Sequence, residues 1–230
     1  MYQNTSLNSN DALLLLEGLG MTLFIFAVSF IAGTAIGFVL AIVRERRIPV
    51  LTQLAAAYVE LFRNSPLLVQ LFLLFFGVPS ILGIHLTPLA AGLITLAINT
   101  GAFMTVIIQA AIEEVPRGQW EAARAYGLGY LATMRHVILP QAVRAMIPPT
   151  VSLAVGQLQV SSLVSIVGVV ELTKIGTNLN LRTLAPFKIW PIVALGYFIV
   201  SKPLSMLADW SEARLKQPGS RRDLGVVSLR

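Results

Sequence analysis

The 230-residue chain has no cysteine and few charged residues. Without cysteine it can form no disulfide, no thiolate metal site and no cysteine nucleophile. Only 12% of the residues are charged, about half the share found in soluble domains, whereas 56% are hydrophobic. This composition excludes a disordered chain and argues against an ordinary soluble enzyme.

Charged residues are missing altogether from three long runs, 18–43, 64–112 and 145–170. A helix that spans a bilayer needs about 20 apolar residues, and its backbone must be hydrogen-bonded internally. The middle run is long enough for two such helices, and glycine and proline residues between Gly77 and Pro88 predict the break between them. The sequence therefore predicts one all-α membrane domain over 1–230, with spans at 18–43, 58–77, 89–112, 145–170 and 187–208.

The basic residues are divided unequally between the two sides of this predicted bundle. Thirteen lie after the first span, between the third and fourth spans, or in the basic tail at 214–230. The other side has three, Lys174, Arg182 and Lys188. Because lysine and arginine concentrate in cytoplasmic loops, we expect the N-terminus outside and the C-terminus in the cytoplasm. The basic tail is then a signal of topology and lipid contact rather than of nucleic-acid binding.

The segment at 113–144 is the longest predicted loop, and its residues favour local structure. Pro116 suits the first turn of a short amphipathic helix that includes Trp120, and Gly127 is a plausible C-cap for it. A second short helix is predicted at 130–137. Two short helices that meet at a glycine would form a protrusion, suited either to docking a soluble partner or to lying on the lipid.

The residues of this protrusion resemble the signature of ABC-importer membrane subunits. Glu121-Ala122-Ala123 is followed after three residues by Gly127, and nine residues later by Val137-Ile138-Leu139-Pro140. The family pattern is EAA, three residues, G, nine residues, then I-x-L-P, so Val137 is the one conservative departure. The segments at 57–70, 99–102, 116–123, 161–165 and 170–172 are also similar to polar amino-acid permeases of the histidine, glutamine, glutamate and arginine type.

The resemblance implies a type I ABC importer permease fold in the bacterial inner membrane. It also implies four kinds of protein or substrate partner: ABC ATPase subunits, a second permease subunit of the same or a similar chain, a periplasmic amino-acid-binding protein and a polar amino acid. The segment Glu121–Leu139 would be the coupling element that docks on the ATPase. The expected coupling residues are Arg117, Trp120, Glu121, Ala122, Ala123, Gly127, Leu139 and Pro140.

The chain carries no nucleotide site of its own, because no Gly-Lys pair and hence no phosphate-binding loop occurs in it. His85 and His136 stand alone, so no metal constellation is predicted, and no catalytic residue is assigned. We therefore expect no enzymatic activity and no cofactor on this chain, with ATP and Mg²⁺ bound by the partner ATPase.

Polar residues within the spans are candidates for a substrate path, because such groups are costly in lipid and usually face a bundle interior. An alternative role is hydrogen bonding between packed helices. Where the family often has Lys-Asp, this chain has Gln159 and Val160, which suggests a less charged substrate or a dimer in which the partner subunit binds it. For the whole chain, the alternatives to transport are a membrane anchor or assembly subunit and, less favoured, a membrane enzyme. The path candidates are Gln70, Asn99, Thr100, Gln157, Gln159, Ser161 and Ser162.

Overall fold

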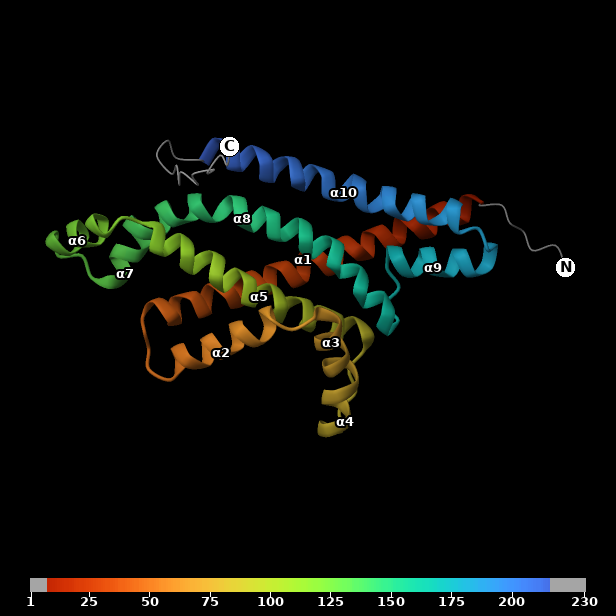
Figure 1. Cartoon of the computed structure of the whole chain (residues 1–230), viewed down its shortest axis with the longest axis horizontal. Helices are drawn as coiled ribbons and strands as arrows, with labels where there is room; N and C mark the ends of the chain where they lie inside the picture. Colours follow the sequence, from red (N-terminus) through yellow and green to blue (C-terminus); the bar gives the residue numbers. More distant parts are fainter. Residues whose placement is uncertain (1–7, 216–230) are drawn as a thin grey trace, which may run out of the picture.

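The computed structural model describes residues 8–215, so part of the basic tail discussed above lies outside the described residues. All regular elements within 8–215 are helical, as the sequence predicts. Four long helices run roughly along the length of an elongated molecule (Figure 1). They are α1 (Ser9–Glu45), α5 (Pro88–Glu114), α8 (Leu139–Val160) and α10 (Pro186–Leu215).

Four helical segments in the described part of the chain are long and apolar enough to cross a membrane. Three of them are α1, α5 and α10, and the fourth is Tyr130–Val167, which contains α8. The number rises to five if the bent pair Leu51–Arg63 and Leu67–Leu82 forms one span. The long helices are rich in apolar side chains that face outward, as expected for helices in contact with lipid or with a partner helix.

The second predicted span, 58–77, is wrong as one continuous helix. The structure has α2 (Leu51–Arg63) and α3 (Leu67–Phe72), with a bend of 108° at the residues between them. Ser65 precedes Pro66, and a residue before proline is pushed out of the α conformation. Pro66 itself is extended, with ψ 132°, and caps α3. The apolar run therefore contains a corner that its hydrophobicity does not reveal.

The predicted end of the second span, at residue 77, is also displaced. The chain stays helical through a π-helical turn, Leu73–Gly77, and through α4 (Val78–Leu82). Pro79, which has no N–H to donate, lies two residues after this π-helical turn, so the helix continues past a residue that usually ends one. The helix ends at Gly83, whose φ of +65° is a left-handed conformation that favours glycine at the cap.

α1 packs along α5 because glycines on α1 let the two backbones approach closely. A Cβ atom on Gly33 would lie 2.5 Å from the Thr100 Cβ, and one on Gly37 would lie 2.5 Å from the Met104 Cβ. The spacing of these glycines predicts a close helix contact, and the structure places that contact within the subunit. The α1–α5 pair is the scaffold on which the remaining helices pack.

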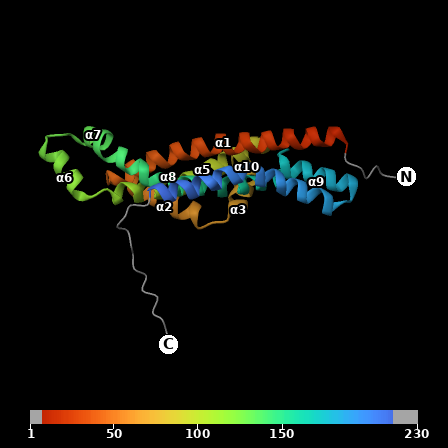
Figure 2. The ribbon, with the colours of Figure 1, turned by 90° about the horizontal axis from the view of Figure 1, so that it is seen from above.

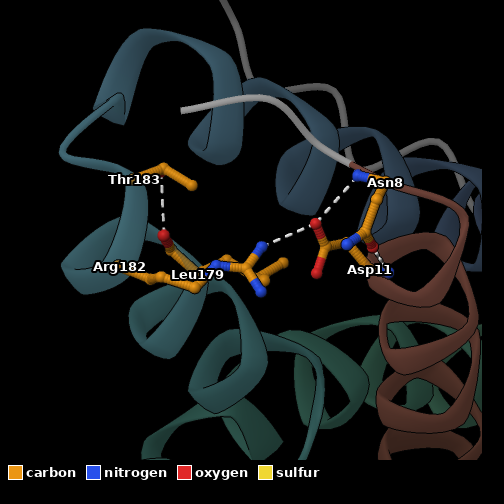
Figure 3. Close-up of polar contacts among 5 residues, drawn as sticks. All are labelled: Asn8, Asp11, Leu179, Arg182 and Thr183. Atoms are coloured by element: carbon orange, nitrogen blue, oxygen red, sulfur yellow. Dashed lines mark hydrogen bonds and ion pairs between the residues drawn. The ribbon is translucent and has the colours of Figure 1, made fainter. Parts of the chain in front are cut away.

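The segment between the fourth and fifth predicted spans contains α9 (Leu172–Thr183), which is tied to α1. Glu171 is fully buried and accepts hydrogen bonds from the Thr22 hydroxyl (3.1 Å) and the Tyr197 hydroxyl (2.7 Å). Near the other end of α9, the Arg182 guanidinium lies 2.6 Å from the buried Asp11 carboxylate (Figure 3). These three polar contacts, two with α1 and one with Tyr197, fix α9 at one end of the molecule.

Candidate functional site

The predicted protrusion is formed by α6 (Arg117–Ala125) and α7 (Tyr130–Thr133), which project at the end of the molecule opposite α9 (Figures 1 and 2). Gly127 has φ +71°, a conformation that glycine adopts without strain, and it closes α6. A π-helical turn, Met134–Ile138, carries the chain from α7 directly into α8. Pro140 lies in the first turn of α8, so it continues the helix rather than ending it.

α6 presents one side to the protein and the other to solvent. Ala123 is buried, and Trp120 packs against a core cluster that includes Met134 and Ile138. Leu139 is half-buried beside the same cluster. The remaining predicted coupling residues are exposed: Arg117, Glu121, Ala122, Gly127 and Pro140. Three of the eight predicted residues, Trp120, Ala123 and Leu139, therefore pack against the protein, whereas five are available to a partner.

The exposed surface of the protrusion also carries apolar groups that the sequence pattern does not single out. The side chain of Tyr126 is 86% exposed and that of Leu131 is 80% exposed. Large apolar groups presented together at a projecting end are typical of a surface that binds a protein or a membrane. In the sequence, the one feature that could have indicated these two residues is their position on either side of the Gly127 turn.

The protrusion is anchored to the end of α1 through Tyr130. The Tyr130 hydroxyl donates a hydrogen bond to the Glu45 carboxylate, and the Arg46 guanidinium lies 4.2 Å from the centre of the Tyr130 ring. From the sequence, Glu45 and Arg46 count only as charges that set the topology. Their contact with a residue 85 positions away could not be read from the sequence.

Two predicted path residues, Gln70 and Asn99, form hydrogen bonds at the corner between α2 and α3. The Gln70 Nε2 donates to the carbonyl oxygens of Phe62 (2.9 Å) and Ser65 (3.0 Å). The Asn99 Nδ2 donates to the Phe62 carbonyl (3.1 Å) and to the Gln70 Oε1 (3.2 Å). These amides satisfy carbonyl groups that the end of α2 leaves without helical partners. Their observed contacts match the alternative role of bonding between helices.

Three more path candidates are engaged in helix packing. The Gln157 Nε2 donates to the Leu96 carbonyl on α5 (3.3 Å). The Ser161 hydroxyl donates to a carbonyl of the preceding turn, that of Leu158 (2.7 Å). Thr100 is fully buried beside Gly33, and its hydroxyl has no hydrogen-bond partner in the described chain.

The accessible candidates lie at the end of α8. Gln159 is exposed, and its neighbour Val160 is 38% exposed. Ser162 is half-buried, and its hydroxyl donates to the Gln159 carbonyl (2.8 Å). From Ser161 to Val167 the chain tightens into a 3₁₀ helix, which ends at Gly168 with φ +100°. The structure therefore brings polar side chains together with a change of helix type at this point.

A family model described as "Binding-protein-dependent transport system inner membrane component" matches residues 33–217. The chain belongs to this family. The probable amino-acid ABC transporter permease YckA of Bacillus subtilis is 36% identical to this permease over 197 residues, which cover 86% of the chain and 87% of the relative. The glutamine transport system permease GlnP of Escherichia coli K12 is 32% identical over 204 residues, covering 88% and 93%.

Solved structures show the same fold. A crystal structure of an amino acid ABC transporter with histidines is 33% identical and matches the permease with a TM-score of 0.81, covering 88% of this chain and 94% of the other. An inward-facing structure of the methionine transporter MetNI matches with a TM-score of 0.77. Its identity is 21%, with 92% of this chain and all of the other covered, so it supports the fold alone. The family membership, the two relatives and the amino acid transporter structure support the prediction of a transport permease and do not favour the anchor alternative.

Proposed function

We propose that this permease forms the membrane path of an importer that carries a polar amino acid. The proposal takes the amino-acid class from the relatives, whose names specify amino acids and, for several, glutamine. The intramembrane polar groups suit such a substrate, because amides, hydroxyls and backbone groups at a helix break can bind a zwitterion without a fixed net charge. Gln159 and Ser162 are the residues we assign to substrate contact, since they combine accessibility with a position beside the 3₁₀ turn.

The observation that carries the proposal is the projecting α6–α7 protrusion. We infer that Glu121–Leu139 docks on a separate ATPase subunit, with Tyr126, Leu131 and Glu121 among the contacts. ATP binding can shift the permease between inward-facing and outward-facing states only if the ATPase contacts differ between those states. The link from Tyr130 to Glu45 gives such a shift a physical route from the protrusion into α1.

We further propose five spans, with the α6–α7 end in the cytoplasm and α9 outside. The permease would lie in a bacterial inner membrane, and a second permease subunit would complete the path. An amino-acid-binding protein in the periplasm would deliver the substrate to the α9 end. Binding of Mg²⁺ and ATP is assigned to the partner ATPase. The unequal distribution of basic residues supports this orientation.

The docking surface is tested by replacing Gly127 with Asp and, separately, with Asn. Both residues tolerate positive φ better than other side chains and have nearly the same shape, so the pair differs mainly in charge. We expect Gly127→Asp to lower binding-protein-dependent uptake of L-glutamine by tenfold or more, and Gly127→Asn to retain most of it. The measurement is ATP-driven uptake into proteoliposomes that contain the whole transporter.

A second measurement separates docking from folding. Size-exclusion chromatography in detergent should show the Gly127→Asp chain folded but no longer co-eluting with the ATPase. Equal uptake by the two variants would remove Gly127 from the docking surface. Absence of ATP-driven amino-acid uptake by the unaltered transporter would refute the proposed function itself.

A further inference from the structure

A charged cleft lies between α2 and α5 and extends to the end of α1. It has a volume of about 210 Å³ and is lined by Arg44, Val59, Glu60, Arg63, Val106, Gln109, Ala110 and Glu113. The cleft is separate from the polar cluster on α8 and from the hydrogen bonds at the α2–α3 corner. None of its charged residues was a path candidate, because in the sequence each of them only marks the end of a charge-free run.

One lining residue of the cleft, Arg63, lies beside α5 within the part of the molecule that we place in the membrane. The Arg63 guanidinium lies 5.4 Å from the centre of the Phe103 ring, and Phe103 is eleven residues from the end of α5 at Glu114. At 1.5 Å per residue this is about 17 Å, roughly half the thickness of the hydrocarbon core. A charged group at that depth faces a water-filled cavity or a protein partner rather than lipid.

The four charged side chains of the cleft do not neutralise one another directly. None of them forms an ion pair with another residue among those described. Instead, Glu60 accepts a hydrogen bond from the Asn64 amide (2.7 Å), and Glu113 accepts one from the Gln109 amide (3.0 Å). Arg63 is placed over the Phe103 ring. The cleft thus presents two guanidinium groups and two carboxylates, and both carboxylates and the Arg63 guanidinium contact uncharged neighbours.

This charge distribution selects a class of ligand. Two carboxylates disfavour a simple anion, two guanidinium groups disfavour a cation, and no metal-binding group of residues occurs within 8–215. A zwitterion matches both signs, because a carboxylate can bind a guanidinium through paired hydrogen bonds while an ammonium binds a carboxylate. The volume is below the roughly 300 Å³ at which pockets for drug-sized ligands begin, so the ligand is small.

We propose that this cleft is a second amino-acid site, in the inner half of the permease, that binds the zwitterionic end of the substrate. The α-carboxylate contacts Arg44 or Arg63, and the α-ammonium contacts Glu60 or Glu113. Arg44 and Glu113 lie near the ends of α1 and α5, and α5 leads into α6, so in the orientation proposed above the site lies toward the cytoplasm. It rests on the proposed function, which supplies the amino-acid substrate, and adds a location at which that substrate is held before release.

The absence of cysteine allows a test that reports on this cleft alone. Ala110 is exposed and lines the cleft, so Ala110→Cys introduces one thiol into the chain at the site. The whole transporter is placed in phosphatidylglycerol nanodiscs without nucleotide or binding protein, and a maleimide labels the thiol. We expect millimolar L-glutamine to slow labelling at least threefold. N-acetyl-L-glutamine, which lacks the ammonium, and L-glutamine methyl ester, which lacks the carboxylate, should give no protection.

Two controls decide whether the protection comes from the cleft. Glu113→Gln in the Ala110→Cys background should raise the glutamine concentration needed for protection about tenfold or more. Glu114→Gln, which alters the adjacent exposed residue outside the cleft lining, should not change it. Ala57→Cys, on α2 but outside the lining, should be labelled at the same rate with and without glutamine.

Several results would overturn the second site. They are equal protection by the analogues that lack one charge, equal protection of Ala57→Cys, or equal behaviour of the Glu113→Gln and Glu114→Gln variants. If the same transporter preparation shows ATP-driven glutamine uptake, any of these results removes the cleft site and leaves the proposed function intact. Unchanged labelling without glutamine and co-elution with the ATPase show that each variant is folded.

Discussion

At the scale of single residues, glycine allows the close approach of α1 and α5. Gly37 lies where α1 crosses α5, and an added Cβ atom would meet the Met104 Cβ at 2.5 Å and the Thr105 backbone nitrogen at 2.9 Å. Backbone atoms cannot move aside as the end of a flexible side chain can. The spacing of Gly33 and Gly37 predicts a close approach of two helices, but only the structure identifies α5 as the partner, because the spacing contains no information about the opposing surface.

We therefore expect Gly37→Ala to destabilise the permease by about 1–3 kcal/mol, the usual cost of overpacking. The matched control is Gly20→Ala, on the same helix, where an added Cβ has nothing within 4 Å. This control should be neutral or slightly stabilising, because alanine favours helix more than glycine does. Thermal unfolding of the purified transporter, followed by tryptophan fluorescence, makes the comparison. A Gly37→Ala variant as stable as Gly20→Ala would contradict the observed α1–α5 packing.

At the scale of helices, the corner between α2 and α3 depends on one buried amide. The Gln70 Nε2 donates to the Phe62 carbonyl, the Ser65 carbonyl and the Ser65 hydroxyl, and the Gln70 Oε1 accepts from Asn99. Without the Gln70 amide, the Ser65 carbonyl would lose its donor and the Phe62 carbonyl would keep only the bond from Asn99. Gln70 thus explains how an otherwise apolar segment can turn through 108°.

Replacing Gln70 with Glu keeps the size of the side chain but removes the donor. We expect a loss of about 1–3 kcal/mol, because the Ser65 carbonyl loses its donor and the carboxylate repels the Phe62 and Ser65 oxygens, while Asn99 still donates to the Phe62 carbonyl. Gln53→Glu, on the exposed side of α2, makes the same chemical change without losing a hydrogen bond and should be near neutral. The melting temperatures of the two variants provide the measurement. Equal melting temperatures would show that Gln70 does not hold the corner.

The corner also shows where prediction from the sequence stops. Ser65-Pro66 is a visible helix-ending signal, yet it lies at the start of a 49-residue charge-free run that favours long helices. Gly77 and Pro79 are equally visible breaking signals, yet the chain remains helical through them. Which of several such signals ends a helix depends on tertiary hydrogen bonds such as those of Gln70, and these join residues far apart in sequence.

At the scale of the whole molecule, the two ends have different chemistry. The α9 end is closed by the Asp11–Arg182 ion pair and the buried Glu171, whereas the α6–α7 end projects and exposes Tyr126 and Leu131. The composition and the spacing of the charges predict the class of the molecule and its long helices, because both follow from the cost of charge in lipid. The attachment of α9 to α1 was not predictable, because Asp11 and Arg182 are 171 residues apart.

The proposed topology makes these ends face opposite sides of the membrane, and the cysteine-free sequence allows a direct test. Asn178 on α9 and Ala125 on α6 are both exposed, so each is replaced separately by cysteine. A membrane-impermeant maleimide should label Asn178→Cys in intact spheroplasts and Ala125→Cys only in inverted vesicles. The unsubstituted chain, which has no thiol, is the control for background. Only the α8 span separates the two positions, so labelling of both from the same side would contradict a complete span at α8. With the N-terminus outside, a re-entrant α2–α3 segment would instead reverse the pattern, with Ala125→Cys labelled in intact spheroplasts and Asn178→Cys only in inverted vesicles.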